Sequence, residues 1–391
     1  MVWSHFNPVN IQAGAGSRSG LGGCVQGKKI LLVTTSGLVR RGTAAEIRAL
    51  VPDADWTVVT VENNPDLDAL ESAAAAYKSL GVTDIVALGG GSALDAAKAL
   101  APALVSNLAR PLAAWLREGF STKPPKLPEP PAPPVIALPT TAGTGAEVTP
   151  FATIWDRAAQ KKRSLAGPEI FPRHALLDPE LTLTLPPEET LFGALDAASH
   201  CLETLWNKAA TPVSLALARE GLARLIDSFP LAEENPEHLG ARETLQTAAL
   251  LGGLAISQSR TAVAHSMSYP LTLRLGLPHG LACGFTLKAV AALVDRAGRW
   301  PAPGDGELAG RALAVFERSD PCAAALKYGT PARFLELAGE METPERAGNF
   351  VLETTPELFR KILAAALTDR RPQERPCSVT TAVSPGRPGR V

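Results

Sequence analysis

Residues 84–98 read DIVALGGGSALDAAK, an apolar run that meets three adjacent glycines and then an alanine-rich stretch. This pattern predicts a buried strand over 84–88 and a following helix with Ser92 as its N-cap. Glycines let a backbone approach a ligand closely, and a helix N-terminus offers unpaired N–H groups and a partial positive charge. The segment therefore suits a pyrophosphate, although a tight strand-to-helix turn needs the same glycines for geometry alone. Its spacing is not that of the G-x-G-x-x-G fingerprint.

The rest of the first half alternates short β-branched runs with helical stretches, which is typical of βαβ units in a parallel sheet. Further strands are expected at 30–34, 56–61, 135–138 and 175–177, and helices at 44–50 and 67–80. Residues 124–134 hold seven prolines, too many missing N–H donors for a helix or a central strand. An α/β dinucleotide-binding domain is therefore expected over 1–185.

The second half has a different texture. Apolar residues recur at helical spacing in 188–207, 212–227 and 243–269, which predicts an all-helical domain over 186–369. Residues 370–391 are rich in proline, arginine, serine and threonine and poor in large apolar side chains. A disordered tail is expected there, because such a segment cannot bury enough apolar surface to become ordered.

Charge and cysteine usage exclude several classes of protein. Lysine and arginine total 38 of the 391 residues and aspartate and glutamate 39, so no field favours a polyanion and no nucleic-acid partner is expected. The five cysteines are scattered and form no C-x-x-C pair, as expected for reduced thiols of a cytoplasmic protein. The sequence shows neither a secretory signal nor an apolar run long enough for a bilayer, so no membrane association is expected.

A second loop of small polar residues follows the strand expected at 135–138. Residues 139–149 read PTTAGTGAEVT, with four threonines. The hydroxyl groups could serve only to cap helices and satisfy a turn. Two such loops at strand ends of one parallel sheet nevertheless favour ligand binding, because α/β sheets bind ligands at the carboxyl ends of their strands.

Four side chains of the second half are candidate metal ligands. In ALDAASH, residues 194–200, Asp196 and His200 are four residues apart and share one face of a helix. An ordinary Asp–His hydrogen bond would explain that pair alone. His265 and His279 follow in apolar surroundings, and burying several imidazoles without a shared task is costly. One oxygen and three nitrogen ligands suit a divalent ion such as iron or zinc, which can act as a Lewis acid.

Four motifs together resemble the iron-containing, group III alcohol dehydrogenase family. They are GGGSALDAAK (89–98), PTTAGTGAEVT (139–149), ALDAASH (194–200) and AHSMSYPLTLRLGLPHG (264–280), and the resemblance spans residues 7–287. It implies a nucleotide-binding α/β domain, a helical domain that holds metal and substrate, and an active site in the cleft between them. It also implies hydride transfer between NAD(P)H and a small aldehyde or alcohol, with Fe²⁺ as the expected ion and Zn²⁺ as the alternative.

The resemblance assigns roles to individual residues. Asp196, His200, His265 and His279 become the metal ligands. The pyrophosphate loop becomes Gly90, Gly91, Ser92 and Asp95, and the rest of the cofactor site Thr140, Thr141, Thr144, Thr149 and Lys162.

The sequence departs from the family pattern at three places. Family members often carry a second histidine four residues after the third ligand, which is thought to deliver protons, whereas this chain has Tyr269. The segment 34–37, TTSG, lacks the acidic residue that many NAD-preferring members have after the first strand, so strict NAD preference is not expected. Arg260 is expected one helical turn before His265, and residues 161–164 add positive charge to a strand pair facing the cleft.

These cations predict an anionic substrate held by Arg260, Arg163 and Ser164. In Arg260 with the stretch around it and in the basic run at 161–163, the sequence resembles the branch of the family that reduces phosphonoacetaldehyde to 2-hydroxyethylphosphonate. One alternative is a reductase of neutral aldehydes such as lactaldehyde or butyraldehyde, in which Arg260 would only pair with a carboxylate. Others are a cofactor-assisted lyase of the dehydroquinate synthase type and a non-catalytic dinucleotide-binding protein, the latter disfavoured by the complete set of ligands. A homodimer is left open.

Overall fold

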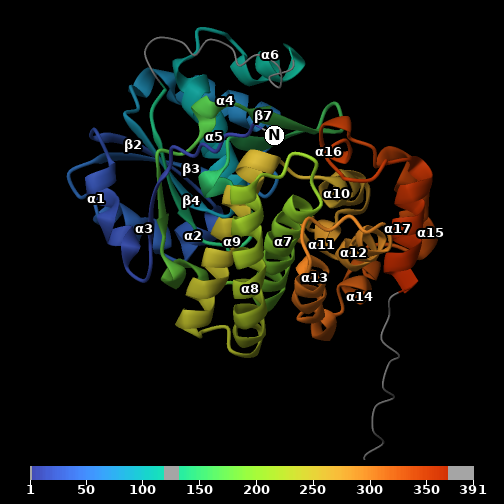
Figure 1. Cartoon of the computed structure of the whole chain (residues 1–391). Coiled ribbons are helices and arrows are strands. Elements are labelled where there is room, and N and C mark those ends of the chain that lie inside the picture. Colours follow the sequence, from blue (N-terminus) through green and yellow to red (C-terminus); the bar gives the residue numbers. More distant parts are fainter. Residues whose placement is uncertain (1, 119–131, 369–391) are drawn as a thin grey trace, which may run out of the picture.

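A computed structural model describes residues 2–118 and 132–368 of the chain (Figure 1). Within these residues, six parallel strands form one sheet in the order β1-β8-β5-β4-β2-β3. Their bounds are β1 Asn10–Ala13, β2 Lys29–Thr34, β3 Asp55–Thr60, β4 Asp84–Gly89, β5 Val135–Pro139 and β8 His174–Leu177. Each strand predicted from the sequence agrees with one of these, which confirms the α/β class. Strand β1, at the sheet edge, was not predicted.

Helices cover both faces of the sheet because successive residues of a strand point to opposite sides. On one face Leu31 and Ile85 pack against α4 (Leu67–Tyr77) and α5 (Gly91–Val105). On the other face, Leu32 and Val86 pack against α1 (Leu21–Cys24), α2 (Ser36–Arg40) and α3 (Thr43–Ala49). Strand β4 is buried along its whole length. It therefore lies in the centre, and its carboxyl end leads into the glycine turn.

The cap predicted for α5 is wrong. The helix begins at Gly91 with Gly90 as its N-cap, and no side chain caps it. Ser92 lies inside the first turn, where its hydroxyl accepts a hydrogen bond from the backbone N–H of Asn64 at 3.1 Å. This contact draws the Ser92 side chain toward the loop after β3.

A short hairpin lies at the border between the two halves of the molecule. Strands β6 (Phe151–Asp156) and β7 (Lys161–Ala166) pair antiparallel outside the main sheet. Strand β7 lies next to α6 (Pro111–Glu118) and α10 (Val263–Leu275). The hairpin therefore carries its basic residues to the border of the helical half.

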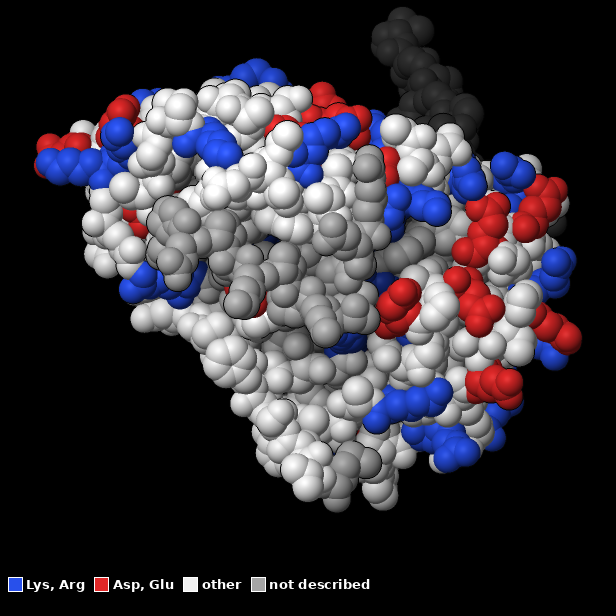
Figure 2. Space-filling model, turned by 90° about the horizontal axis from the view of Figure 1, so that it is seen from above, with Lys and Arg blue, Asp and Glu red and all other residues white. Residues whose placement is uncertain are grey.

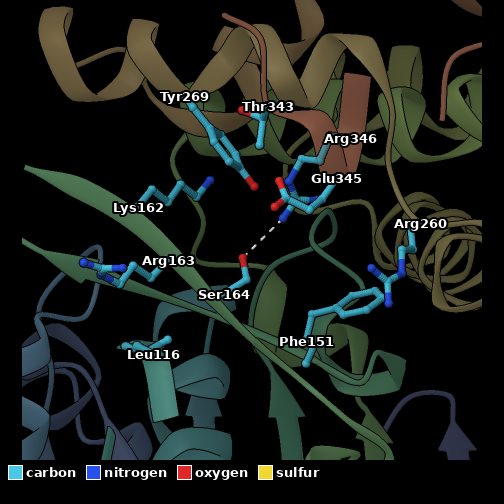
Figure 3. Close-up of a pocket in the computed structure, with 11 residues that line it drawn as sticks. Leu116, Phe151, Lys162, Arg163, Ser164, Arg260, Tyr269, Thr343, Glu345 and Arg346 are labelled. Atoms are coloured by element: carbon cyan, nitrogen blue, oxygen red, sulfur yellow. Dashed lines mark hydrogen bonds between the residues drawn. The ribbon is translucent and has the colours of Figure 1, made fainter. Parts of the chain in front are cut away.

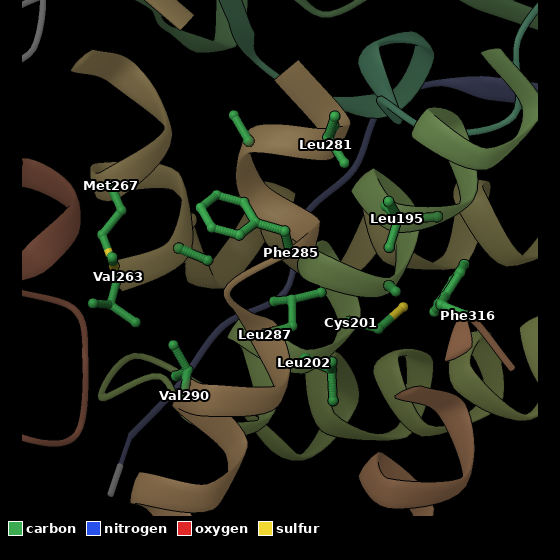
Figure 4. Packing of buried hydrophobic residues seen from close by; sticks show 14 of the residues in the cluster. Leu195, Cys201, Leu202, Val263, Met267, Leu281, Phe285, Leu287, Val290 and Phe316 are labelled. Atoms are coloured by element: carbon green, nitrogen blue, oxygen red, sulfur yellow. The ribbon is translucent and has the colours of Figure 1, made fainter. Parts of the chain in front are cut away.

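The second half is built of helices around one apolar core. Besides α10, their bounds are α7 Pro187–Leu205, α8 Pro212–Glu234, α9 Leu239–Ser259, α11 His279–Gly284, α12 Leu287–Arg296, α13 Asp305–Ala314, α14 Pro321–Leu326, α15 Pro331–Glu336, α16 Pro344–Ala347 and α17 Pro356–Thr368. Leu195 and Leu202 of α7, Val263 and Met267 of α10 and Leu281 of α11 meet in this core (Figure 4). The long helices α7, α8 and α9 lie side by side next to the sheet domain (Figure 1).

The single helical stretch predicted over 243–269 is wrong, because α9 ends at Ser259 and α10 begins at Val263. Between them Arg260 has a φ of 62° and a ψ of 178°. The carboxylate of Glu203, on α7, accepts hydrogen bonds from the backbone N–H groups of Ala262 and Ala264. A side chain from another helix thus caps the start of α10 and stabilises the break.

Several of the predicted features lie outside the described residues or stay predictions. Most of the proline-rich stretch and the whole tail expected at 370–391 lie outside the described residues, and the domain limits stay predictions. No described helix combines the length and apolar character that crossing a membrane requires. Basic and acidic side chains are interspersed on the face drawn in Figure 2, in keeping with a net charge of -1.

Candidate active site

The four predicted metal ligands converge on one carboxylate oxygen. Asp196 and His200 lie one turn apart on α7, His265 lies on α10, and His279 begins α11. The Nε2 atoms of His200, His265 and His279 lie 3.7, 3.7 and 3.8 Å from Oδ1 of Asp196. Three elements that are distant in sequence thus place their donor atoms around a common point.

The donor atoms suit a divalent ion. Asp196 Oδ1 and His265 Nε2 are buried and have no hydrogen-bond partner among the described residues. Ligands about 2.0–2.2 Å from one ion in a tetrahedral arrangement are roughly 3.3–3.6 Å apart, close to the separations here. Burial lowers the pKa of His265 and of His279 well below 6.5, and neighbouring positive groups lower both further. Both imidazoles are therefore neutral, as metal ligands must be.

Glu203 is part of this centre and was missed in the sequence. Its Oε2 lies 2.6 Å from Nδ1 of His265, which directs the other ring nitrogen toward Asp196. Burial raises the pKa of Glu203 to about 7, although hydrogen bonds from three backbone N–H groups oppose this shift. Glu203 follows His200 by three residues on α7, so helical spacing alone could have placed it on the ligand face.

Cys283 supplies a further donor atom that the sequence analysis did not select. Donor atoms of Asp196, His265, His279 and Cys283 all lie within 4.8 Å of one another. The Sγ atom lies 3.9 Å from both ring nitrogens of His279, one turn earlier on α11. Burial raises the pKa of Cys283 well above 9.0, so the group stays a thiol in this arrangement. The spacing of four residues from His279 was the available signal.

The two loops predicted to bind the cofactor contact each other at the carboxyl ends of β4 and β5. A Cβ atom on Gly90 would lie 3.1 Å from the side chain of Thr141, and one on Gly91 would lie 2.8 Å from that of Thr144. The backbone N–H of Thr140 donates to the carbonyl of Gly89 at 3.0 Å. No side-chain oxygen caps the first N–H groups of α5, so a ligand could bind them beside the two loops.

Asp95 and Thr149, both predicted to bind the cofactor, have hydrogen-bond partners that tie the hairpin to α5. Asp95 accepts a hydrogen bond from the backbone N–H of Thr153 at 2.8 Å. The Thr149 hydroxyl lies 3.3 Å from Nζ of Lys98, which also donates to the carbonyl of Phe151 at 2.7 Å. Burial lowers the pKa of Lys98 to about 8. These contacts anchor the β6–β7 hairpin on α5, so Asp95 and Thr149 have a structural task whatever their role toward a cofactor.

The remaining predicted residues line one pocket between the hairpin and the helical half (Figure 3). They are Lys162, Arg163, Ser164, Arg260 and Tyr269. The Lys162 ammonium, expected at the cofactor, lies 4.2 Å from the centre of the Tyr269 ring. Arg346 also lines this pocket and was missed, because α16 follows His265 by about eighty residues and carries no recognisable motif.

Arg260 lines this pocket from another position than the one predicted. Arg260 does not share a helical face with His265, since the two residues lie on opposite sides of the break between α9 and α10. Its side chain is exposed and still lines the pocket. Arg163 is engaged with Asp156, whose Oδ2 lies 2.9 Å from its Nε.

Comparison with known proteins gives consistent results. Residues 8–179 match the family described as iron-containing alcohol dehydrogenase, and residues 190–381 match the C-terminal part of the Fe-containing alcohol dehydrogenase family. A phosphonoacetaldehyde reductase of Streptomyces viridochromogenes is 37% identical over 66% of this chain and 65% of its own length. A choline dehydrogenase of Bacillus subtilis is 32% identical over 64% of this chain and 62% of its own length. The chain thus aligns with slightly less than two thirds of these curated relatives.

A solved structure matches over the whole fold. The sulfoacetaldehyde reductase from Bifidobacterium kashiwanohense in complex with NAD⁺ superimposes with a TM-score of 0.80 and 27% identity, covering 95% of this chain and all of that one. An α/β domain with glycine- and threonine-rich turns at its strand ends, beside an Asp and three His residues that converge, is typical of a metal- and nicotinamide-dependent oxidoreductase. The chain belongs to the iron-containing alcohol dehydrogenase family.

Proposed function

We propose that the protein reduces a small anionic aldehyde with NAD(P)H, and that this aldehyde is phosphonoacetaldehyde, giving 2-hydroxyethylphosphonate. The observation that carries the proposal is a pocket lined by the cations Lys162, Arg260 and Arg346. Lys162 and Arg346 lie near enough to contribute to the lowered pKa of His279. A substrate anion in this pocket would place its carbonyl group toward the metal ligands.

The chain's residues divide the task between them. Asp196, His200 and His265 have side chains at most 5% exposed, whereas His279 is 31% exposed, so the ligand cluster is open on the side of His279. A divalent ion held there would polarise a carbonyl group as a Lewis acid. The proposed cofactor site is formed by the glycine loop and the threonine loop, through Gly90, Gly91, Ser92, Asp95, Thr140, Thr141, Thr144 and Thr149. Lys162, which was predicted to bind the cofactor, lines the pocket for the anion.

The relatives support this choice and define the alternative. The phosphonoacetaldehyde reductase and the sulfoacetaldehyde reductase are named for aldehydes that carry an anionic group, whereas choline carries a cation. A reductase of neutral aldehydes is the second candidate, because Arg163 is already paired with Asp156 and the acidic Glu345 lines the same pocket. The family match favours a dehydrogenase over a lyase of the dehydroquinate synthase type. A cytoplasmic location and a homodimer stay predictions.

An aldehyde panel tests the proposal. Purified protein reconstituted with Fe²⁺ or Zn²⁺ is incubated with reduced cofactor, and cofactor absorbance is followed with phosphonoacetaldehyde and with propionaldehyde. One charge-assisted contact contributes about 1.5–3 kcal/mol, so kcat/KM should favour phosphonoacetaldehyde by roughly one to two decades. Equal or faster reduction of propionaldehyde would support the neutral-aldehyde alternative instead.

Cofactor choice is a separate prediction. Thr35 follows β2 where an acidic residue would repel a 2′-phosphate, and its side chain caps α2 by accepting from Leu38 N–H. Arg40 and Arg41 follow a few residues later. NADPH should therefore be accepted at least as well as NADH. Side-by-side kinetics decide this, and a hundredfold preference for NADH would mean that another group selects the ribose.

A further inference from the structure

Arg346 has a fixed position in the pocket. Its guanidinium donates to the Thr261 hydroxyl and, through Nη2, to the Ser164 hydroxyl at 3.3 Å (Figure 3). Its Cζ atom lies 5.0 Å from the centre of the Tyr269 ring. The neighbouring Asn349 side chain donates to the carbonyl of Thr261 at 2.8 Å. Strand β7, the break before α10 and α16 thus hold this side chain jointly.

The positive charge of Arg346 has no ion-pair partner in the part of the chain that the structure describes. Among the described residues no carboxylate lies within ion-pair distance of it, and its hydrogen-bond partners are neutral hydroxyl groups. Arg163 differs, since Asp156 neutralises it. An anion could therefore bind Arg346 without breaking an existing ion pair, and the planar guanidinium matches the oxygens of a phosphonate.

A second cation faces the same ring. The Lys162 ammonium lies 4.2 Å and the Arg346 Cζ 5.0 Å from the centre of the Tyr269 ring. Burial and then repulsion from Arg346 lower the pKa of Lys162, and the more weakly acting carboxyl groups of Asp196 and Asp95 oppose this shift. Two like charges in a half-buried pocket destabilise each other unless an anion joins them. In Figure 3, Lys162, Ser164, Tyr269 and Arg346 point toward one another, whereas Arg163 and Arg260 lie at opposite sides.

We propose that Arg346 is the specificity-determining residue that binds the anionic end of the substrate, with Ser164 and Tyr269 as positioning residues and Lys162 as the second cation. This assignment rests on the proposed function. Many family members have a proton-delivering histidine at the position of Tyr269. The Tyr269 ring lies against both cations, so its role here is to position them. The expected ligand end is a tetrahedral oxyanion such as a phosphonate, whose several oxygens can contact Arg346 and Lys162 together.

The test compares Arg346→Met with Arg346→Lys in the metal-loaded enzyme. Losing a contact of about 1.5–3 kcal/mol should raise KM for phosphonoacetaldehyde by roughly one to two decades in Arg346→Met. The kinetic constants for propionaldehyde should change by a smaller factor than the KM for phosphonoacetaldehyde. Arg346→Lys should recover part of the loss, because it keeps the charge without the fork. Calorimetric binding of 2-hydroxyethylphosphonate in the presence of reduced cofactor should weaken in parallel; an alcohol and a reduced cofactor cannot exchange a hydride, so this readout does not depend on turnover.

Arg274→Met is the matched control, because Arg274 lies on α10 outside the pocket and pairs with Glu340 at 3.0 Å. It should leave both substrates unchanged. Equal losses on both aldehydes in Arg346→Met, or an unchanged phosphonate KM while wild type prefers phosphonoacetaldehyde, would overturn the assignment and leave the proposed function standing. A wild type without that preference would instead refute the proposed function. Should Arg346→Met fail to fold, Ser164→Ala removes the hydroxyl that bonds to Arg346 and to Tyr269. It should raise the phosphonate KM several-fold, and no change would count against the assignment.

Discussion

Glu203 determines how His265 is presented to the metal centre. Its two carboxylate oxygens accept from the backbone N–H groups of Ala262, Ala264 and His265 and meet Nδ1 of His265. Glu203→Gln replaces one acceptor by an N–H₂ group, so the imidazole loses its partner or the turn loses its cap. Metal affinity should fall by about 10- to 100-fold, as for other partners of ligating histidines.

Competition with a chelator measures that affinity, and His265→Ala is the reference variant that should lose the metal and activity together while cofactor binding is kept. If Glu203→Gln bound metal as tightly as wild type, Glu203 would have only a role in the turn. Full metal occupancy in His265→Ala would remove His265 from the site.

Lys162 predicts a pH dependence specific to anionic substrates. Burial, with a further contribution from Arg346, lowers the pKa of Lys162 to about 8. The cation is present below that pH and lost as the pH rises through it. The kcat/KM for phosphonoacetaldehyde should therefore fall above about pH 8, and propionaldehyde should not show this fall. Parallel pH profiles of both substrates, repeated with Lys162→Met, test it; identical profiles in wild type would assign the titration to another group.

At the scale of elements, local patterns predicted what local forces determine. Short apolar runs predicted the ends of the central strands to within a residue. A strand such as β4 is buried on both faces and therefore needs a continuous apolar run. The break between α9 and α10 could not be predicted in this way. It depends on Glu203, more than fifty residues earlier, whose carboxylate binds the N–H groups of the turn. Helical periodicity continues through the break and hides it.

Arg260 in that turn makes the break testable. Its φ of 62° and ψ of 178° fall in a region that is essentially restricted to glycine. Arg260→Gly should relieve about 1–3 kcal/mol of strain, less roughly 0.5–1 kcal/mol for the freedom of glycine in the unfolded chain, whereas Arg260→Ala keeps the strain. The glycine variant should therefore melt at the higher temperature in a calorimetric scan. Both variants lack the guanidinium, so any loss of activity toward phosphonoacetaldehyde should be the same in both. Equal melting temperatures would show that the backbone at residue 260 is not strained.

At the scale of the whole molecule, the site joins residues that only the tertiary structure brings together. Asp196, His200, His265 and His279 could be selected from the sequence because two of them share a helix face and a family pattern connects the rest. Arg346 could not, since its role depends on the packing of α16 against the α9–α10 turn and on the hairpin, and neither contact leaves a periodic signal.

The two halves of the molecule meet through paired glycines. A Cβ atom on Gly143 of the threonine loop would lie 2.7 Å from Cα of Gly193 on α7, and one on Gly253 of α9 would lie 2.7 Å from Cα of Gly145. These obstacles are backbone atoms, which cannot move aside as a flexible side chain can. The close approach places the threonine loop directly against the helices, one of which carries Asp196 and His200.

Gly253→Ala should therefore separate the threonine loop from α9. Overpacking costs about 1–3 kcal/mol, and the displaced loop should bind reduced cofactor more weakly. Gly310→Ala on α13 is the matched control, because a Cβ atom there meets nothing within 4 Å. That change should stabilise the protein by roughly 0.5–1 kcal/mol, since alanine favours a helix over glycine. The melting temperature should fall in Gly253→Ala and rise in Gly310→Ala. Cofactor affinity, measured by fluorescence, should fall only in Gly253→Ala. A Gly253→Ala protein with unchanged stability and cofactor affinity would show that the contact between the two halves does not depend on these glycines.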